Sequence, residues 1–372
     1  MSTTKKAIIG FFALRIPLIF TLLIVAVIVV IIGNFLIVGG GHISWEFLTT
    51  EPRNMNTEGG IFPAIYGTVL LVLIMTLAAV PVGTITAIYL TEYARQNSWL
   101  ARTIRFAVNT LAGVPSIVFG LFGLGFFIQT VGAQIDRVNW NQTMSTFHAS
   151  LETRQSPVAG GKIATIDEVQ KYLESSKEYD WKEQISSLST FPRGTDARVN
   201  DDIVMRFMDD KVSLKWGKPG LIWAAFTLAL LTLPVVIVSV EESLKTVPKD
   251  IRAASLALGA TKWETIRKVV IPNSITGILT GSILAIGRGA GEVAPILFTG
   301  AVYSLQGLPS SLSDQFMHLG YHLYILSTQS PDVDAVRPLQ YATTLVLLAL
   351  TLALNFTAIL LRSHIRRRQI TS

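Results

Sequence analysis

The chain has 372 residues, half of them hydrophobic, and only 15% of them are charged. Soluble domains carry about 25% charged residues, so this composition excludes a disordered chain and argues against an ordinary cytosolic enzyme. The chain has no cysteine, which excludes disulfides, thiolate metal sites and a catalytic thiol. Its formal net charge of +6 becomes informative only once the charges are placed along the chain.

Six apolar runs are long enough to cross a membrane, which takes about 20 helical residues. Five of the runs contain no charged residue, and the remaining one is interrupted only by Arg288 and Glu292. We therefore predict an all-α polytopic membrane protein with six transmembrane helices. The runs are 16–43, 59–91, 106–135, 219–240, 274–302 and 338–361.

The first run follows Lys5 and Lys6, as the apolar core of a secretory signal peptide does. Such a core has about 7–15 residues, and this run is much longer. No small-residue cleavage site follows the run. We expect an uncleaved first transmembrane helix.

Lysine and arginine concentrate in alternate segments between the runs, and only Arg53 and Arg337 lie in the other short segments. The positive-inside rule assigns the basic segments to the cytoplasm, so we expect both termini there. The cytoplasmic group is Lys5, Lys6, Arg15, Arg95, Arg102, Arg105, Lys245, Lys249, Arg252, Lys262, Arg267, Lys268, Arg362, Arg366, Arg367 and Arg368.

One connecting segment, 133–218, is long and rich in aromatic residues and in charges of both signs. Long domains are exempt from the positive-inside rule, so the place of this segment after the third helix puts it outside. A capping box at 165–168 predicts a short helix to about Ser176, and a second helix is predicted from Asp201. The aromatic content favours a small folded domain over a flexible linker.

These features predict four parts. They are 1–60 with the first helix and an outer loop, 61–132 with helices two and three, 133–218 as an extracytoplasmic inserted domain, and 219–372 with helices four to six and a cytoplasmic loop at 246–272.

Loop 246–272 is predicted to form two short helices joined by a sharp bend at Gly259. Pro248 suits the first turn of a helix, and Gly259 suits the left-handed residue that ends one. Thr261 and Glu264 form a capping box that begins a second helix, which is expected to end before Pro272. On physical grounds alone, a basic amphipathic hairpin lying on the membrane surface explains the loop equally well.

Residues 253–259 (AASLALG) and 269–272 (VVIP) resemble the EAA loop of ABC importer permeases. In that family the loop docks into a cleft of the ATP-binding subunit and transmits its closure to the membrane helices. The resemblance implies a coupling loop that contains Ala253, Ala254, Leu258, Gly259, Ala260, Trp263, Ile266 and Pro272.

Ala253 stands where the family usually has the glutamate that gives the loop its name. The contact of that glutamate is then absent or made by another residue, such as Asp250. Docking is expected to rest on the apolar and small side chains of Leu258, Ala260, Trp263 and Ile266.

No phosphate-binding loop for a nucleotide is encoded, because the nearest stretch, 160–162, lacks the first glycine and the Ser/Thr of the motif. ATP and Mg²⁺ are therefore expected on partner subunits. We expect this chain to be non-catalytic and to hold no cofactor.

Arg288 and Glu292 are four residues apart and are predicted to share one helix face. If the fifth helix begins near Ser274, Arg288 lies about 21 Å along it, in the middle third of a core about 30 Å thick. Charges at that depth usually face a cavity or a partner and often mark a transport path. Arginine also suits phosphate, since its planar fork can donate two parallel hydrogen bonds. The alternative is an internal ion pair that only fixes helix packing.

Glycines surround this charged pair. Gly277 and Gly281, and then Gly287 and Gly291, form pairs of small residues that permit close contact between helices. Together with Gly289, they could instead loosen the helix beside the charge. Close packing is the role that we predict.

Residues 287–299 (GRGAGEVAPILFT) closely resemble the GETAPLLFT region of phosphate permeases of the PstA kind. Residues 87–94 (AIYLTEYA) and 111–124 (LAGVPSIVFGLFGL) agree with the same family. Val293 replaces the usual threonine, and segment 133–218 has no counterpart in the family's usual short loop.

The resemblance implies the fold of type I ABC importer permeases, placed in the inner membrane, with Arg288 and Glu292 on the phosphate path. It also implies three kinds of partner: a sister permease (PstC-like), a dimer of ATP-binding subunits (PstB-like) and an extracytoplasmic phosphate-binding protein (PstS-like). No nucleic acid partner is expected, because no pattern of alternating basic and aromatic residues occurs.

Alternatives within and beyond this class stay open. A sulfate or molybdate permease, or the sister phosphate permease of the PstC kind, would share most of these features. A secondary transporter would need an ion-coupling site, and a membrane-anchored receptor would use 133–218 as its ligand domain. The loop 246–272 argues against the secondary transporter, and six spans exceed what an anchor needs.

Three further residues are weighed between a structural and a functional role. His318 and His322, one helical turn apart, have only Asp314 as a third metal ligand nearby, so we expect a structural role for both. Glu92 ends the second run beside a basic segment, where an interfacial salt bridge is expected.

Overall fold

The computed structural model describes residues 3–53, 58–95, 98–139, 215–305, 307–330 and 332–371. The chain divides into two compact units: one joins Met1–Leu124 to Pro219–Ser372, and the other is Gly125–Lys218. The helices predicted at 165–176 and from Asp201 lie outside the described residues.

Six helices in the described part of the chain are long and apolar enough to cross a membrane, which confirms the predicted all-α architecture with six spans. Each span overlaps one of the six apolar runs, although the fifth begins at Lys262, well before its run. The spans are Arg15–His42, Phe62–Tyr93, Ser116–Asn139, Leu221–Thr246, Lys262–Gly289 and Asp334–Arg367.

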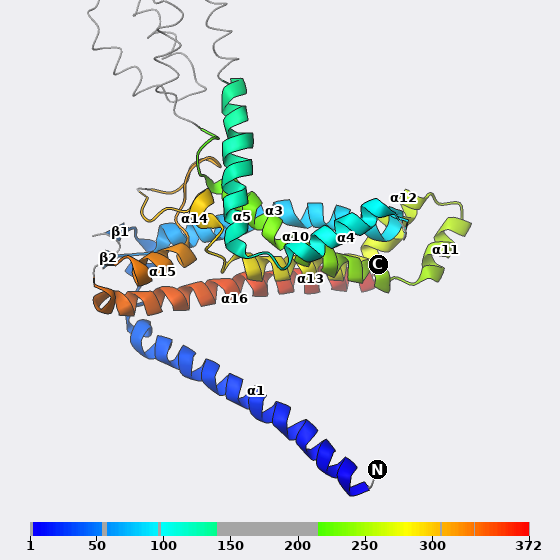
Figure 1. Cartoon of the computed structure of the whole chain (residues 1–372), viewed down its shortest axis with the longest axis horizontal. Coiled ribbons are helices and arrows are strands. Elements are labelled where there is room, and N and C mark those ends of the chain that lie inside the picture. Colours follow the sequence, from blue (N-terminus) through cyan, green and yellow to red (C-terminus); the bar gives the residue numbers. More distant parts are fainter. Residues whose placement is uncertain are drawn as a thin grey trace, which may run out of the picture. The chain divides into compact units, whose positions relative to one another are not determined.

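The elements of the first unit are almost all helical (Figure 1). Two short strands, β1 (Pro52–Arg53) and β2 (Glu58–Gly59), form an antiparallel pair between the first two spans, with Pro52 opposite Gly59. The helices are α1 (Thr3–Gly39), α2 (Trp45–Thr49), α3 (Phe62–Ile88), α4 (Trp99–Leu111), α5 (Ser116–Phe122), α10 (Leu221–Thr246), α11 (Lys249–Ala257), α12 (Lys262–Thr265), α13 (Ile271–Gly289), α14 (Ile296–Thr299), α15 (Leu319–Thr328) and α16 (Val333–Thr371).

Helix α10 forms the centre of the first unit, where it packs against both α3 and α13. Leu228 and Leu231 of α10 are almost fully buried, as are Leu71 and Met75 of α3. By contrast, the side chains of α1 from Ile16 onward are mostly exposed and apolar. The C-terminal part of α1 contacts α16 through Phe35 and Tyr341, and the exposed apolar surface of the rest suits a lipid environment.

The third apolar run is wrongly predicted as a single helix, because the chain breaks between α4 and α5. Pro115 adopts an extended ψ of 137° immediately before α5. A residue that precedes proline is disfavoured in the helical region, so Val114 cannot continue α4 smoothly. The spanning helix therefore begins at Ser116, and α4 is a separate amphipathic helix that buries Ala101 and Val108.

Within the second unit, the described residues show how the two ends of the inserted segment are held together. The Asp136 carboxylate accepts hydrogen bonds from the backbone N–H groups of Trp216 and Gly217, at 2.9 Å and 2.6 Å. Gly132 lies so close to the Trp216 carbonyl that a side chain would not fit. These contacts hold the two ends of the inserted segment next to each other.

Candidate functional site

The loop 246–272 has the predicted helix–glycine–helix form. Helix α11 ends at Ala257, and Gly259 follows with φ of +87°, a conformation that favours glycine. The Thr261 hydroxyl accepts a hydrogen bond from the Glu264 N–H, while the Glu264 carboxylate accepts one from the Thr261 N–H. This capping box, predicted from the sequence, begins α12.

The bend presents apolar side chains to the surface. Leu258 is 90% exposed and Trp263 is 55% exposed, while Ala253 and Ala254 are exposed on α11 and Ala260 is half-buried. Large apolar side chains that are exposed close together usually mark an interaction surface. The exposed Leu258 and Trp263 give the bend of the loop the properties of such a surface.

Ile266 does not belong to that surface. Its side chain is 1% exposed and packs in the core beneath the loop, with Val270 and Leu244. The hydroxyls of Ser255 and Thr265 are 2.9 Å apart and join α11 to the following helix. Ile266 therefore anchors the loop to the bundle, and the prediction that its side chain serves docking directly is wrong.

Pro272 does not end the second helix of the loop. A π-helical turn at Ile266–Val270 comes directly before α13, which carries Pro272 in its first turn. Proline lacks a backbone N–H donor, and the wider π turn and the start of a new helix accommodate this loss. One helical span therefore runs from Lys262 to Gly289. The expectation that the second helix ends before Pro272 is wrong.

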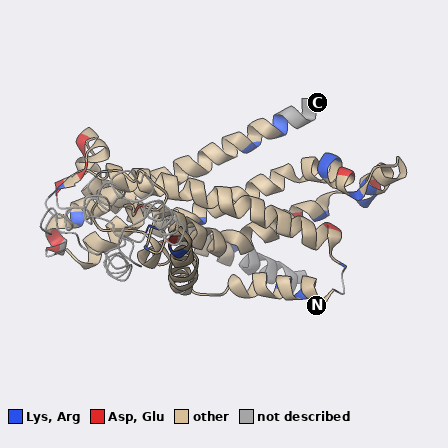
Figure 2. Cartoon of the chain, turned by 90° about the horizontal axis from the view of Figure 1, so that it is seen from above, with Lys and Arg blue, Asp and Glu red and all other residues tan. Residues whose placement is uncertain are grey.

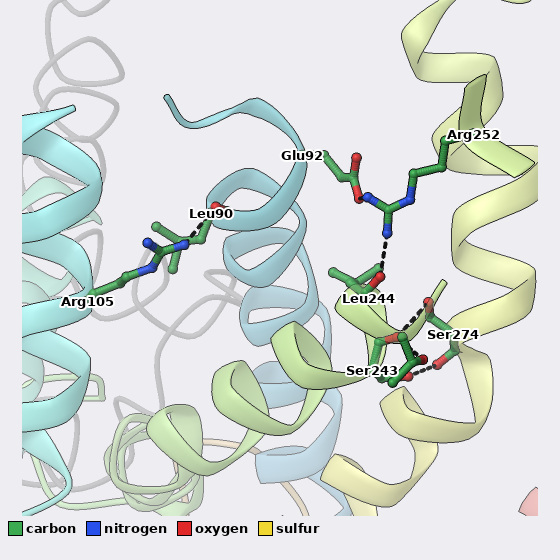
Figure 3. A network of polar contacts seen from close by, with 8 residues as sticks. Leu90, Glu92, Arg105, Ser243, Leu244, Arg252 and Ser274 are labelled. Atoms are coloured by element: carbon green, nitrogen blue, oxygen red, sulfur yellow. Dashed lines mark hydrogen bonds and ion pairs between the residues drawn. The ribbon is translucent and has the colours of Figure 1, made fainter. Parts of the chain in front are cut away.

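The loop is tied to the bundle by a partly buried ion pair between Glu92 and Arg252 (Figure 3). Arg252 Nη1 lies 2.8 Å from Glu92 Oε1, and the two side chains are 20% and 9% exposed. Arg252 also donates a hydrogen bond to the Leu244 carbonyl at the end of α10. The predicted salt bridge of Glu92 is thus confirmed, and it joins α11 to the end of the second span.

Glu241 forms a second group of ion pairs near the same ends of the helices. Glu241 of α10 forms ion pairs with Arg105 of α4 at 3.0 Å and with Lys245 at 2.9 Å. Arg105 also donates to the Leu90 carbonyl at 3.1 Å (Figure 3). Sequence analysis missed this link between α4 and α10. The spacing of Glu241 and Lys245 indicates only their own pair within α10, and no local pattern indicates the contact with Arg105.

Arg288 and Glu292 come together, although not on one helix face as predicted. Helix α13 ends at Gly289, so Arg288 lies in its last turn and Glu292 lies in the non-helical segment before α14. Arg288 Nε is 3.5 Å from Glu292 Oε1, and the two side chains are 37% and 22% exposed. A cation in the last turn also suits the negative end of the helix dipole.

The neighbours of Arg288 place it level with the middle of the longer spans. A side chain at Gly289 would come within 2.4 Å of the Met75 sulfur, and Met75 lies in the interior of α3. On the other side, Gly287 lies against Asn355 in the interior of α16. The helix begins earlier than Ser274, yet the Arg288 side chain still lies level with the interior of the bundle.

The predicted packing role of the glycines is confirmed for those that face another helix. A Cβ added at Gly277 would lie 2.0 Å from the Ser243 Cβ, and one at Gly281 would lie 3.3 Å from the Ser239 Cβ. Ser243 also donates a hydrogen bond to the Ser274 carbonyl at 3.1 Å, a contact that the close approach of α10 and α13 permits. A Cβ added at Gly291, by contrast, would lie more than 4 Å from any neighbouring atom among the described residues.

Asn355 is a polar residue of the interior that sequence analysis missed. Its Oδ1 atom is buried and has no hydrogen-bond partner among the described residues. Its Nδ2 would lie 3.2 Å from a Cβ at Gly287, next to Arg288 in the chain. A lone amide within a long apolar run is the signal that could have found it, because such groups are costly unless they bind something.

His318 and His322 are buried and uncharged. Burial alone lowers the pKa of His318 to about 3 and that of His322 to about 4. Asp314 does not face them as a third ligand, since it caps its own loop by accepting hydrogen bonds from the Ser310 and Ser311 N–H groups. In the part of the chain that the structure describes, no three His, Asp or Glu side chains are placed to hold a metal ion.

Comparison with known proteins identifies the class of molecule. The sequence profile of the family described as "Binding-protein-dependent transport system inner membrane component" matches residues 79–371. The chain belongs to this family. It is therefore the permease component of an ABC importer, a non-catalytic multi-pass protein of the inner membrane.

Some relatives of this permease are named only as ABC transporter permeases, and others are named as phosphate permeases. It is 25% identical over 327 residues to "Probable ABC transporter permease protein YqgI" of Bacillus subtilis, covering 84% of this chain and 82% of that one. It is 31% identical to "Phosphate transport system permease protein PstA" of Yersinia pestis, covering 72% and 57%. It is also 30% identical to "Phosphate transport system permease protein PstC" of Mesorhizobium japonicum, covering 68% and 59%.

Membership decides between the classes that the sequence left open. A permease of this family works with ATPase subunits and a substrate-binding protein, so neither a secondary transporter nor a membrane-anchored receptor fits. The loop 246–272 lies within the matched residues.

Proposed function

We propose that this permease conducts inorganic phosphate into the cytoplasm by alternating access, and that it is the PstA-like member of its complex. Arg288 carries the proposal. Its half-exposed side chain lies level with the interior of the bundle, and the one ion pair that it forms among the described residues, with Glu292, has an N–O distance of 3.5 Å. A guanidinium that is neither buried nor tightly paired can exchange a carboxylate for a phosphate oxygen.

Glu292 holds Arg288 when no phosphate is present and releases it when the anion arrives. Its place in the non-helical segment after Gly289 supports this role, because such a segment can move without breaking helical hydrogen bonds. The Asn355 amide, beside Gly287, adds a second polar group at the same level. These groups together would lower the free-energy cost of moving an anion through the apolar interior.

The partners follow from the same proposal. A PstC-like sister permease would complete the path, a PstB-like dimer would bind and hydrolyse ATP with Mg²⁺, and a PstS-like protein would deliver phosphate. The exposed Leu258 and Trp263 would enter the cleft of the ATP-binding subunit. With Ala253 in place of the family's glutamate, this contact would rest on apolar burial.

The proposal also sets the orientation of the chain. Lys and Arg gather at the end of the bundle that carries α11 and α12, and few charges lie along the middle of the helices (Figure 2). With the positive-inside rule, this distribution supports placing that end and both termini in the cytoplasm. Segment 133–218 would then lie outside.

Substrate competition tests the choice of anion. The complete complex, reconstituted in liposomes with ATP at the side of the ATP-binding subunits, is expected to take up radiolabelled phosphate. Unlabelled phosphate should suppress this uptake, and equal concentrations of sulfate or molybdate should not. Uptake that sulfate or molybdate suppresses as strongly as phosphate would assign the permease to another oxyanion.

A further inference from the structure

A basic pocket lies at the α11 end of the bundle, separate from Arg288. Its volume is about 570 Å³, and it is bounded by the ends of α3, α4, α10 and α11. Its lining includes the buried apolar residues Leu90, Ala101 and Val247. The cationic side chains that line it come from five positions: Arg95, Arg105, Lys245, Lys249 and Arg252.

The pocket carries excess positive charge. No Asp or Glu is among its described lining residues. The nearby Glu92 is paired with Arg252, and Glu241 is shared between Arg105 and Lys245. Two carboxylates cannot neutralise five cations, and a concave surface with one sign of charge concentrates ions of the opposite sign.

The pocket also holds polar groups that lack partners. Arg105 Nε, Arg252 Nε and the Thr91 hydroxyl are buried and, among the described residues, form no hydrogen bond. Other nitrogens of the two guanidinium groups already contact Glu92 and the carbonyls of Leu90 and Leu244 (Figure 3), as well as the Glu241 carboxylate. A buried polar group without a partner is costly, so the two guanidinium groups beside the pocket keep unmet hydrogen-bonding capacity.

We propose that this pocket binds a phosphate-class oxyanion. The ligand is either free inorganic phosphate or the phosphate headgroup of an anionic phospholipid, since both present the same tetrahedral oxygens to arginine and lysine. The bound anion bridges α11 to α3 and α4, and so holds the 246–272 loop against the bundle. Arg288 takes no part in this site, which extends beyond the proposed transport path.

Thermal unfolding of the full chain, purified in a neutral detergent, tests the site. All samples carry Arg288→Gln, so that an anion on the transport path does not contribute. Each sample is titrated separately with inorganic phosphate and with phosphatidylglycerol, and phosphatidylcholine serves as the neutral lipid. A ligand that binds the folded chain raises the unfolding temperature in a dose-dependent way, from which an apparent affinity follows.

The key variant is Arg95→Gln/Lys249→Gln, which removes two exposed cations of the pocket. It leaves the ion pairs of Glu92 and Glu241 intact. Arg102→Gln is the matched control, because Arg102 is an exposed cation of α4 that does not line the pocket. Each basic residue near an anionic group contributes roughly fivefold in affinity, so the double variant should bind at least about tenfold more weakly. The control should bind as the parent does.

The two probes distinguish the source of the anion. Stabilisation by inorganic phosphate that the double variant weakens assigns the pocket to the free anion. Stabilisation by phosphatidylglycerol alone, weakened in the same way, assigns it to a lipid headgroup. If neither probe stabilises the parent, or if the double variant responds as the parent does, the proposed site is refuted. None of these outcomes tests the role of Arg288 in transport, because every sample carries Arg288→Gln.

Discussion

The two ends of the helical bundle are stabilised by different chemistry. The end that carries α11 is held by ion pairs, Glu92 with Arg252 and Glu241 with Arg105. The end that carries α15 is held by neutral burial, with His318 fully buried and uncharged. Figure 1 shows α11 and α15 at opposite ends of the long helices.

Under the proposed function, the α11 end would receive the ATP-binding subunit at its exposed loop. Ion pairs there could re-form with new charged partners when the subunit moves. Neutral, tightly packed groups resist rearrangement and suit an end that stays rigid. The Arg288–Glu292 pair lies between the two, with a contact longer than those of the α11 end.

Lowering the pH should destabilise the α15 end and give the largest decrease in the free energy of unfolding among these predictions. The pKa values of His318 and His322 are lowered to about 3 and about 4, whereas an unfolded histidine titrates near 6.5. Between pH 7 and pH 5 the unfolded chain takes up protons that the folded chain does not. The free energy of unfolding should therefore fall by about 2 kcal/mol for each histidine.

Thermal unfolding of the wild type and of His322→Leu at pH 7 and pH 5 measures this effect. Both ring nitrogens of His322 lack a partner among the described residues, so leucine removes a titrating group without breaking a hydrogen bond there. The variant should lose about half of the pH dependence. An undiminished pH dependence in His322→Leu would show that other groups cause it.

Glu92→Ala should be the most damaging single change at the α11 end. It leaves Arg252 partly buried without its carboxylate, and breaking a buried pair costs roughly 3 kcal/mol. Asp334→Ala is the matched control, because Asp334 pairs with Arg337 on an exposed surface, where the loss is at most about 1 kcal/mol.

A double-mutant cycle separates the pair from other effects of the substitution. Arg252→Ala alone should also destabilise the chain, and Glu92→Ala/Arg252→Ala should cost less than the sum of the two. Unfolding temperatures that simply add would mean that the two residues do not interact.

Gly277→Ala tests the packing that joins α10 to α13. Its added Cβ would lie 2.0 Å from the Ser243 Cβ, so the helices must separate, at a cost of about 1–3 kcal/mol. Gly291→Ala adds the same atom where nothing lies within 4 Å and should change the unfolding temperature little. Equal effects of the two substitutions would contradict the packing role of Gly277.

Much of this arrangement follows from local patterns in the sequence. Charge-free length revealed the six spans, and the spacing of Thr261 and Glu264 revealed the capping box after Gly259. These features depend on neighbours within one helical turn, for which residue type and spacing are sufficient.

The sequence-based predictions that the structure contradicts share another origin. The ends of helices inside apolar runs, after Leu111 and Gly289, depend on the backbone effects of proline and glycine, which hydropathy does not record. The continuation of the helix through Pro272 depends on a π turn, which has no clear sequence signal. The burial of Ile266 and the Glu241–Arg105 link depend on distant segments, and only the folded chain brings these together.

ATP-driven phosphate uptake by Arg288→Gln tests the central claim most directly. In an assembled complex, Arg288→Gln should lower uptake about 10- to 100-fold, because it removes a charged hydrogen-bond donor worth about 1.5–3 kcal/mol. Arg366→Gln, at an exposed site near the end of α16, should leave uptake unchanged. Uptake by Arg288→Gln equal to that of the wild type, in a complex with its full complement of subunits, would contradict the account.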